Sequence, residues 1–185
     1  MAADQLDQIA ADFRAVSDRA RKLVARVGVA RLCERPPKGG WSIAECLEHL
    51  NLTTRAFLPQ WRDKFADARS RGLVGDGPYR TELWGKLLKW MLEPPAKFRM
   101  PTTPPFNPLK TPPADQVLPA FLASQEELLA ILSEAHGLAL DRIKVTSPFQ
   151  EKMKYSVWSS FVIGAAHHRR HLWQAERVAD AIGAN

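Results

Sequence analysis

Three of the chain's five histidines stand where a helical protein could bring imidazoles together on one divalent metal ion. His167 and His171 are four positions apart in the segment AAHHRRHLWQ. Because an α-helix turns about 100° per residue, both side chains lie on one helix face and can reach the same ion. His49, in the distant segment GGWSIAECLEHL, would supply the third ligand. Three neutral imidazoles leave an open position on the metal, which lowers the pKa of a bound water or captures a thiolate.

Small and polar residues share the helix faces of these histidines. Gly164 lies one turn before His167 and would leave space above the ion. His168 projects about 100° away from the direction of His167. Glu45 precedes His49 by one turn, and Gln174 lies close to the direction of the other two ligands. We therefore take Glu45 and Gln174 as candidate catalytic residues, which would assist by proton transfer or by positioning a substrate.

An alternative interpretation needs no metal. The segment HHRRH would then be a solvated basic face in which Arg169 and Arg170 are ordinary surface residues, and His49 would be a hydrogen-bonded core histidine. Cys46 is expected to pack as a small apolar residue. The six tryptophans, Trp41 among them, are expected to pack in the core or against helices rather than to stack on nucleic-acid bases.

The apolar residues recur at three- and four-residue spacing and predict four long helices and one short helix. Ser42 and Glu45 form a capping box at the start of the second helix, and Ser156 is a candidate cap for the last. A short extended piece at 142–146 is the exception, so an all-α four-helix bundle is predicted. The long helices are expected over residues 4–32, from 43 into the charged stretch 62–71, over 114–135 and over 156–182, and the short helix over 81–92.

The connections are marked by proline and glycine. The segment ERPPKGG, residues 34–40, is expected to be a loop. Residues 93–113 contain eight prolines, which exclude regular helix and predict an extended segment strapped over the surface. The length of 185 residues fits a single helical domain spanning 1–185.

Composition narrows the cellular setting and the partners. No basic leader followed by an apolar stretch and no run of about 20 apolar residues is present, so we expect a cytoplasmic protein that does not enter membranes. Two cysteines, Cys33 and Cys46, are too few for a disulfide scaffold. The net charge is +6, but the 26 basic residues are scattered among 20 acidic ones, and no nucleic-acid partner is expected.

Two segments near opposite ends of the chain, GGWSIAECLEHLN and AAHHRRHLWQAERV, resemble the DinB-like superfamily, also called the YfiT-like metalloenzymes. In that family a W-S-x-x-E-x-x-x-H-L segment supplies one histidine and a terminal H-x-x-x-H supplies two. The resemblance extends along nearly the whole chain and is loosest in the proline-rich residues 93–113. The motifs map onto Trp41, Ser42, Glu45, His49 and Leu50, and then onto His167 and His171.

This resemblance implies a four-helix bundle with up-down-down-up helix directions, a homodimer, and zinc or nickel held by three histidines. Characterised relatives include transferases and isomerases that depend on low-molecular-weight thiols such as bacillithiol or mycothiol. The leading hypothesis is therefore a metal-dependent transferase in which the thiol attacks a small-molecule electrophile. Two alternatives stay open: a metal-dependent hydrolase with water in place of the thiol, and a noncatalytic, stress-associated metal-binding protein.

Overall fold

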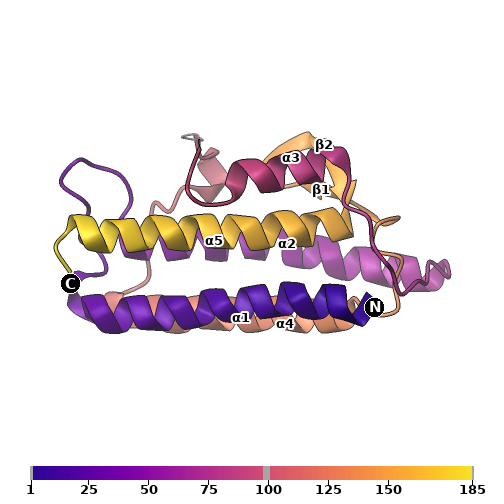
Figure 1. Ribbon diagram of the computed structural model, residues 1–185, viewed down its shortest axis with the longest axis horizontal. Helices are drawn as coiled ribbons and strands as arrows, with labels where there is room; N and C mark the ends of the chain where they lie inside the picture. The colour runs from indigo at the N-terminus through magenta and orange to yellow at the C-terminus, as the bar shows by residue number, and fades with distance from the viewer. Residues whose placement is uncertain (1, 98–100, 185) are drawn as a thin grey trace.

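Helices account for most of the computed structural model, which describes residues 2–97 and 101–184. Four of them are long and lie side by side (Figure 1), and α3 is a shorter helix outside this group. Two short 3-10 helices, Val29–Arg31 and Pro104–Phe106, occur in the connections. The α-helices are α1 (Ala2–Val27), α2 (Ile43–Ser70), α3 (Leu83–Leu92), α4 (Ala114–Glu134) and α5 (Val157–Ala181).

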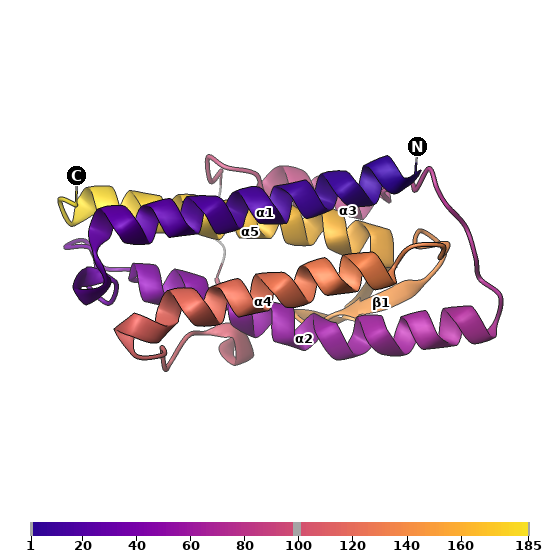
Figure 2. The same ribbon diagram turned by 90° about the horizontal axis from the view of Figure 1, so that it is seen from below.

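The four long helices run in two opposite directions. Figures 1 and 2 show α1 and α5 running one way and α2 and α4 running the other. Ion pairs between α1 and α5 keep the same order along both helices, because Arg19 contacts Glu176 and Arg26 contacts Asp180. Helix α1 packs on α4 and α5, and α2 packs on the same two helices. Helices α2 and α5 are therefore neighbours and pack antiparallel to each other.

Two apolar clusters follow one another along the helix axes. One contains Phe13 and Phe161, the other contains Leu50 and Phe121, and each draws on all four long helices. Buried polar side chains occupy the positions between the clusters on three of these helices. We call four of them the polar layer: Thr54 on α2, Ser124 and Gln125 on α4, and His168 on α5.

Most helix boundaries agree with the sequence-based expectation. The predicted capping box is present: Ser42 Oγ accepts from the Glu45 amide at 3.2 Å, and the Glu45 carboxylate accepts from the Ser42 amide at 2.7 Å. The first helix was predicted too long, because it ends at Val27 rather than near residue 32. Gly28 follows with φ of 80°, a left-handed conformation that ends the helix.

A two-stranded antiparallel hairpin accompanies the predominantly helical fold that was predicted. Strand β1 (Lys144–Ser147) pairs with β2 (Gln150–Ser156), and the register is irregular between Thr146 and Ser147. The extended piece expected at 142–146 corresponds to β1, whereas β2 was not predicted. In β2 only Tyr155 and Ser156 are buried, so the strand lacks the alternation of apolar and polar residues that identifies a half-buried strand.

Helix α3 packs closely on the start of α5. A Cβ atom added at Gly85 would lie 3.0 Å from the Ser159 Cβ, which is closer than side-chain atoms normally approach. The outward face of α3 is apolar, because Leu83 and Trp84 are 82% and 66% exposed. The expectation that all tryptophans pack against helices is therefore wrong for Trp84.

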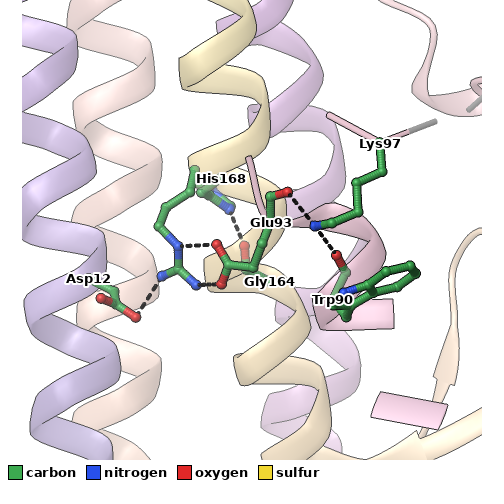
Figure 3. A network of polar contacts seen from close by, with 7 residues as sticks. Asp12, Trp90, Glu93, Lys97, Gly164 and His168 are labelled. Atoms are coloured by element: carbon green, nitrogen blue, oxygen red, sulfur yellow. Dashed lines mark hydrogen bonds and ion pairs between the residues drawn. The ribbon is translucent and has the colours of Figure 1, made fainter. Parts of the chain in front are cut away.

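The end of α3 is fixed by a polar network that links three helices (Figure 3). Arg169 on α5 donates to Asp12 on α1 at 2.7 Å and also pairs with Glu93, which follows α3. Lys97 Nζ donates to the Trp90 carbonyl at 2.9 Å. Arg169 is therefore a structural bridge and not the ordinary surface residue of the alternative interpretation. Within the described part of the chain, no helix is both long and apolar enough to span a membrane.

Candidate metal centre

The structure brings the three predicted histidines together. His49 lies in the second turn of α2, just after the capping box, while His167 and His171 lie one turn apart in α5. One ring nitrogen from each residue can be chosen so that all three lie within 4.8 Å of one another. The Nε2 atoms of His49 and His167 are 3.2 Å apart. The antiparallel packing of α2 on α5 thus joins the two sequence motifs in one site.

Hydrogen bonds at the far side of two rings decide which nitrogen faces the centre. His49 Nδ1 lies 2.7 Å from the Phe106 carbonyl, and His171 Nδ1 lies 3.1 Å from the Gln174 side-chain oxygen. Both partners accept hydrogen bonds, so each Nδ1 carries the proton and each Nε2 presents a lone pair. In a tetrahedral site with bonds of 2.0–2.1 Å, two ligand nitrogens are about 3.3 Å apart. The 3.2 Å separation of the His49 and His167 nitrogens fits such an ion.

The three imidazoles are neutral at physiological pH. Burial lowers the pKa of His49, and the hydrogen bond to Phe106 offsets part of this effect. Burial, together with the neighbouring imidazoles, lowers the pKa of His167 and His171 well below the usual range. Neutral imidazole is the form that binds metals, so the cluster is ready for a cation without first losing protons.

A cavity of about 840 Å³ opens beside the three histidines. The ring of Trp41 lies 4.9 Å from the His49 ring and 5.8 Å from the His171 ring, while Phe149 lies 5.9 Å from His167. Aromatic rings therefore cover the histidines on two sides and limit their contact with water. Trp41 was expected to serve packing alone, but it lines the cavity.

Comparison with known proteins agrees with this geometry. The sequence model of the DinB superfamily matches residues 12–175, a span that includes all three histidines. The chain belongs to the DinB superfamily. No match was found among curated proteins or among solved structures. Family membership together with the histidine cluster supports a metal-dependent protein.

The two candidate catalytic residues of this DinB chain have different surroundings. Gln174 lines the cavity and holds the His171 ring. Glu45 is not among the described residues that line the cavity; its carboxylate accepts from Ser42 and pairs with Arg35. Burial raises the pKa of Glu45, but the hydrogen bonds from Arg35 and Ser42 outweigh burial and keep it below the ordinary value. A role for either residue in proton transfer stays a prediction.

His168 turns away from the histidine cluster into the interior of the DinB fold. Its side chain is 3% exposed, and its ring meets Phe13 edge-on at 5.1 Å. Nδ1 lies 2.9 Å from the Gly164 carbonyl (Figure 3), whereas Nε2 has no hydrogen-bond partner among the described residues. Burial lowers its pKa to about 4. The sequence excluded it from the ligands, but its place in the core was missed, although it follows Phe161 and Ala165 at core spacing.

Arg170 and the two cysteines are the remaining residues near the site for which an expectation was drawn from the sequence. Arg170 is 8% exposed, lines the cavity and donates to the Met91 carbonyl at 3.2 Å, so it is not a solvated surface residue. Cys46 packs in the second apolar cluster, as predicted, and burial raises the pKa of its thiol far above the usual range. Cys33 is exposed, and the two cysteines are not bonded to each other.

Proposed function

We propose that this DinB-superfamily protein is a divalent-metal-dependent transferase that joins a low-molecular-weight thiol to a small-molecule electrophile. The single observation that carries the proposal is the set of three converging histidines beside a cavity of about 840 Å³. We further propose zinc or nickel as the metal, the family's four-helix bundle as a single domain over 1–185, a homodimer as the assembly, and a cytoplasmic location.

The number of ligands favours an enzyme over a noncatalytic metal protein. Structural zinc sites have four protein ligands, whereas catalytic sites have three and keep a position for water or substrate. Among the described residues, the metal-binding group contains His49, His167 and His171 with no fourth histidine, cysteine or carboxylate. Cys46 is close in sequence, but it is fully buried in the apolar cluster.

The surroundings of the histidines favour a thiol over water as the nucleophile. A bound divalent ion would lower the pKa of a thiol placed beside it, so that the sulfur reacts as a thiolate. Arg170 and Lys97 line the cavity and would attract the carboxylates that low-molecular-weight thiols carry. The thiolate sulfur would then bond to the electrophilic carbon as the leaving group departs. Hydrolysis needs a base for water, and the contacts of Glu45 with Ser42 and Arg35 make it less suited to that task.

Elemental analysis and a transfer assay together test the proposal. Protein purified without an affinity tag should contain about one zinc or nickel per chain. Loaded protein should accelerate the reaction of bacillithiol, mycothiol or cysteine with 1-chloro-2,4-dinitrobenzene, and a chelator should remove that rate until metal is restored. Metal-dependent cleavage of esters without thiol transfer would favour a hydrolase. Absence of metal from several preparations would contradict the proposal, and bound metal without either reaction would favour the noncatalytic alternative.

The ligand assignment has its own test. His171→Ala should abolish stoichiometric metal binding in a folded protein, because an open site depends on each of its three ligands. His168→Leu is the matched control, since it alters the neighbouring histidine that faces the core. It should keep the metal. Equal loss of metal in both folded variants would show that the wrong member of HHRRH has been assigned.

Gln174 tests the orientation of the ligands. Gln174→Ala removes the acceptor at His171 Nδ1 and should weaken metal binding by about 10- to 100-fold, as loss of such partners does in other sites. Gln174→Glu keeps an acceptor in place and should bind metal at least as well as the wild-type protein. Isothermal titration of metal-free protein with zinc measures both. Equal affinities for all three proteins would remove Gln174 from the site.

A further inference from the structure

The cavity continues past the histidine cluster into the interior between the long helices. Each long helix contributes to its inner wall: Phe13 from α1, Thr54 from α2, Leu128 from α4 and His168 from α5. Phe161 lies there as well and belongs to the same apolar cluster as Phe13 and Leu128. We call this region the inner chamber and define it by these five residues. Two of these residues, Thr54 and His168, also belong to the polar layer.

Two residues of the inner chamber each carry a polar atom that has no hydrogen-bond partner among the described residues. These atoms are Thr54 Oγ1 and His168 Nε2, and their residues are only 2% and 3% exposed. Buried polar atoms without a partner are rare in native proteins, because burial without a hydrogen bond is unfavourable. An interior that keeps two of them beside a cavity is suited to a ligand that completes their hydrogen bonds.

The chemistry of these atoms limits what such a ligand can be. His168 Nδ1 donates to the Gly164 carbonyl, so Nε2 can only accept a hydrogen bond. Thr54 Oγ1 can donate or accept. The other three residues of the chamber are apolar, and an ionised group placed among them would be strongly disfavoured. The ligand group must therefore be uncharged, mostly apolar, and equipped with a donor.

We propose that the inner chamber is a binding subsite for an uncharged, ring-sized apolar group that carries a hydroxyl or amide N–H. The donor of this group hydrogen-bonds to His168 Nε2, and Thr54 Oγ1 provides the second contact. The subsite rests on the proposed function in one respect, because the group would be the end of the electrophilic substrate remote from the metal. Binding of the group itself requires no ion.

Phenol and toluene are suitable probes, because they differ mainly by a hydroxyl in place of a methyl group. The quantity of interest is the ratio of the toluene Kd to the phenol Kd, measured by ligand-observed NMR on wild-type protein with and without zinc. His168→Leu should lower this ratio by about tenfold, since one buried hydrogen bond is lost. Thr54→Val, which preserves the side-chain shape, should lower it by about threefold.

Ser124→Ala is the matched control. Ser124 also belongs to the polar layer and its Oγ also lacks a partner among described residues, but it does not line the cavity. Its ratio should equal that of the wild-type protein, and the wild-type ratio should be the same with and without zinc. Thr54→Val keeps the test decisive if His168→Leu does not fold.

The outcomes separate this inference from the proposed function. An unchanged ratio in folded Thr54→Val and His168→Leu would overturn the subsite, even if metal-dependent thiol transfer were established. Equal effects of Ser124→Ala and Thr54→Val would also overturn it, because the change would then reflect the core and not a contact. A ratio that falls as expected in protein without thiol-transfer activity would support the subsite and contradict the proposed reaction.

Discussion

Replacing His168 with leucine should change how the stability of the metal-free protein depends on pH. The ring is buried, and its pKa in the folded protein is about 4, against an ordinary value of 6.5. Between these two values the unfolded chain binds a proton on His168 and the folded chain does not, so acidification favours unfolding. The stability involved is fully present above pH 6.5 and declines as the pH falls towards 4.

The size of the effect follows from the same two values. Each unit of pKa difference corresponds to about 1.4 kcal/mol, so at pH 5 His168 should have removed about 2 kcal/mol from the free energy of unfolding. The leucine variant lacks this pH-dependent loss of stability from His168, but it keeps the losses that come from the other buried histidines. Its stability should therefore fall by about 2 kcal/mol less than that of the wild-type protein between pH 7 and pH 5.

Urea unfolding followed by circular dichroism, with a chelator present throughout, measures this difference. At pH 5 most carboxylates remain ionised, and any that do not are common to both proteins. His136→Leu is the matched control for the loss of a histidine, because the side chain of His136 is exposed. Parallel losses of stability in wild-type and His168→Leu protein would refute the assignment of His168 as a neutral core residue.

Three further substitutions test the packing around the site. Gly85→Ala should lower the thermal midpoint, because the new Cβ would lie 3.0 Å from the Ser159 Cβ. Gly164→Ala should instead raise stability by about 0.5–1 kcal/mol, because the nearest atom to its new Cβ is 3.9 Å away and alanine favours helix more than glycine does. Thermal unfolding of the two variants should therefore shift in opposite directions, and shifts of the same sign would contradict the described spacing. Ser42→Ala should cost about 1 kcal/mol in urea unfolding through loss of the cap, with metal content retained; no measurable change would remove Ser42 from that role.

Local patterns were sufficient to predict the helices that carry the three histidines. The three- and four-residue spacing of apolar residues located α4 and α5 to within about a residue, and the S-x-x-E pattern located the start of α2. Because His167 and His171 share one face of a continuous helix, their joint position follows from helix geometry alone. The position of His49 in the same site could be predicted only from the two motifs together, because the sequence of α2 does not indicate which helix packs against His49.

Tertiary contacts explain what the sequence did not reveal. Strand β2 is mostly exposed and carries little apolar alternation, so pairing with β1 determines its conformation. The acceptor for His49 is a main-chain carbonyl at Phe106, an atom that every residue type provides. Arg169 lies in a basic-looking segment, and its role depends on Asp12 and Glu93 being brought to it from two other elements. Periodicity within one segment contains no information on any of these contacts.

The hydrogen bond between His49 and the Phe106 carbonyl uses main chain alone on the Phe106 side, so the side chains of the same segment can change without loss of this contact. Thr102, Thr103 and Asn107, in the same proline-rich segment, line the cavity. Their replacement would reshape the cavity while the Phe106 carbonyl continued to accept the hydrogen bond from His49 Nδ1. Point substitutions in this one irregular segment would therefore change which small molecules the cavity admits, while the three histidines and the tautomer of His49 stay unchanged.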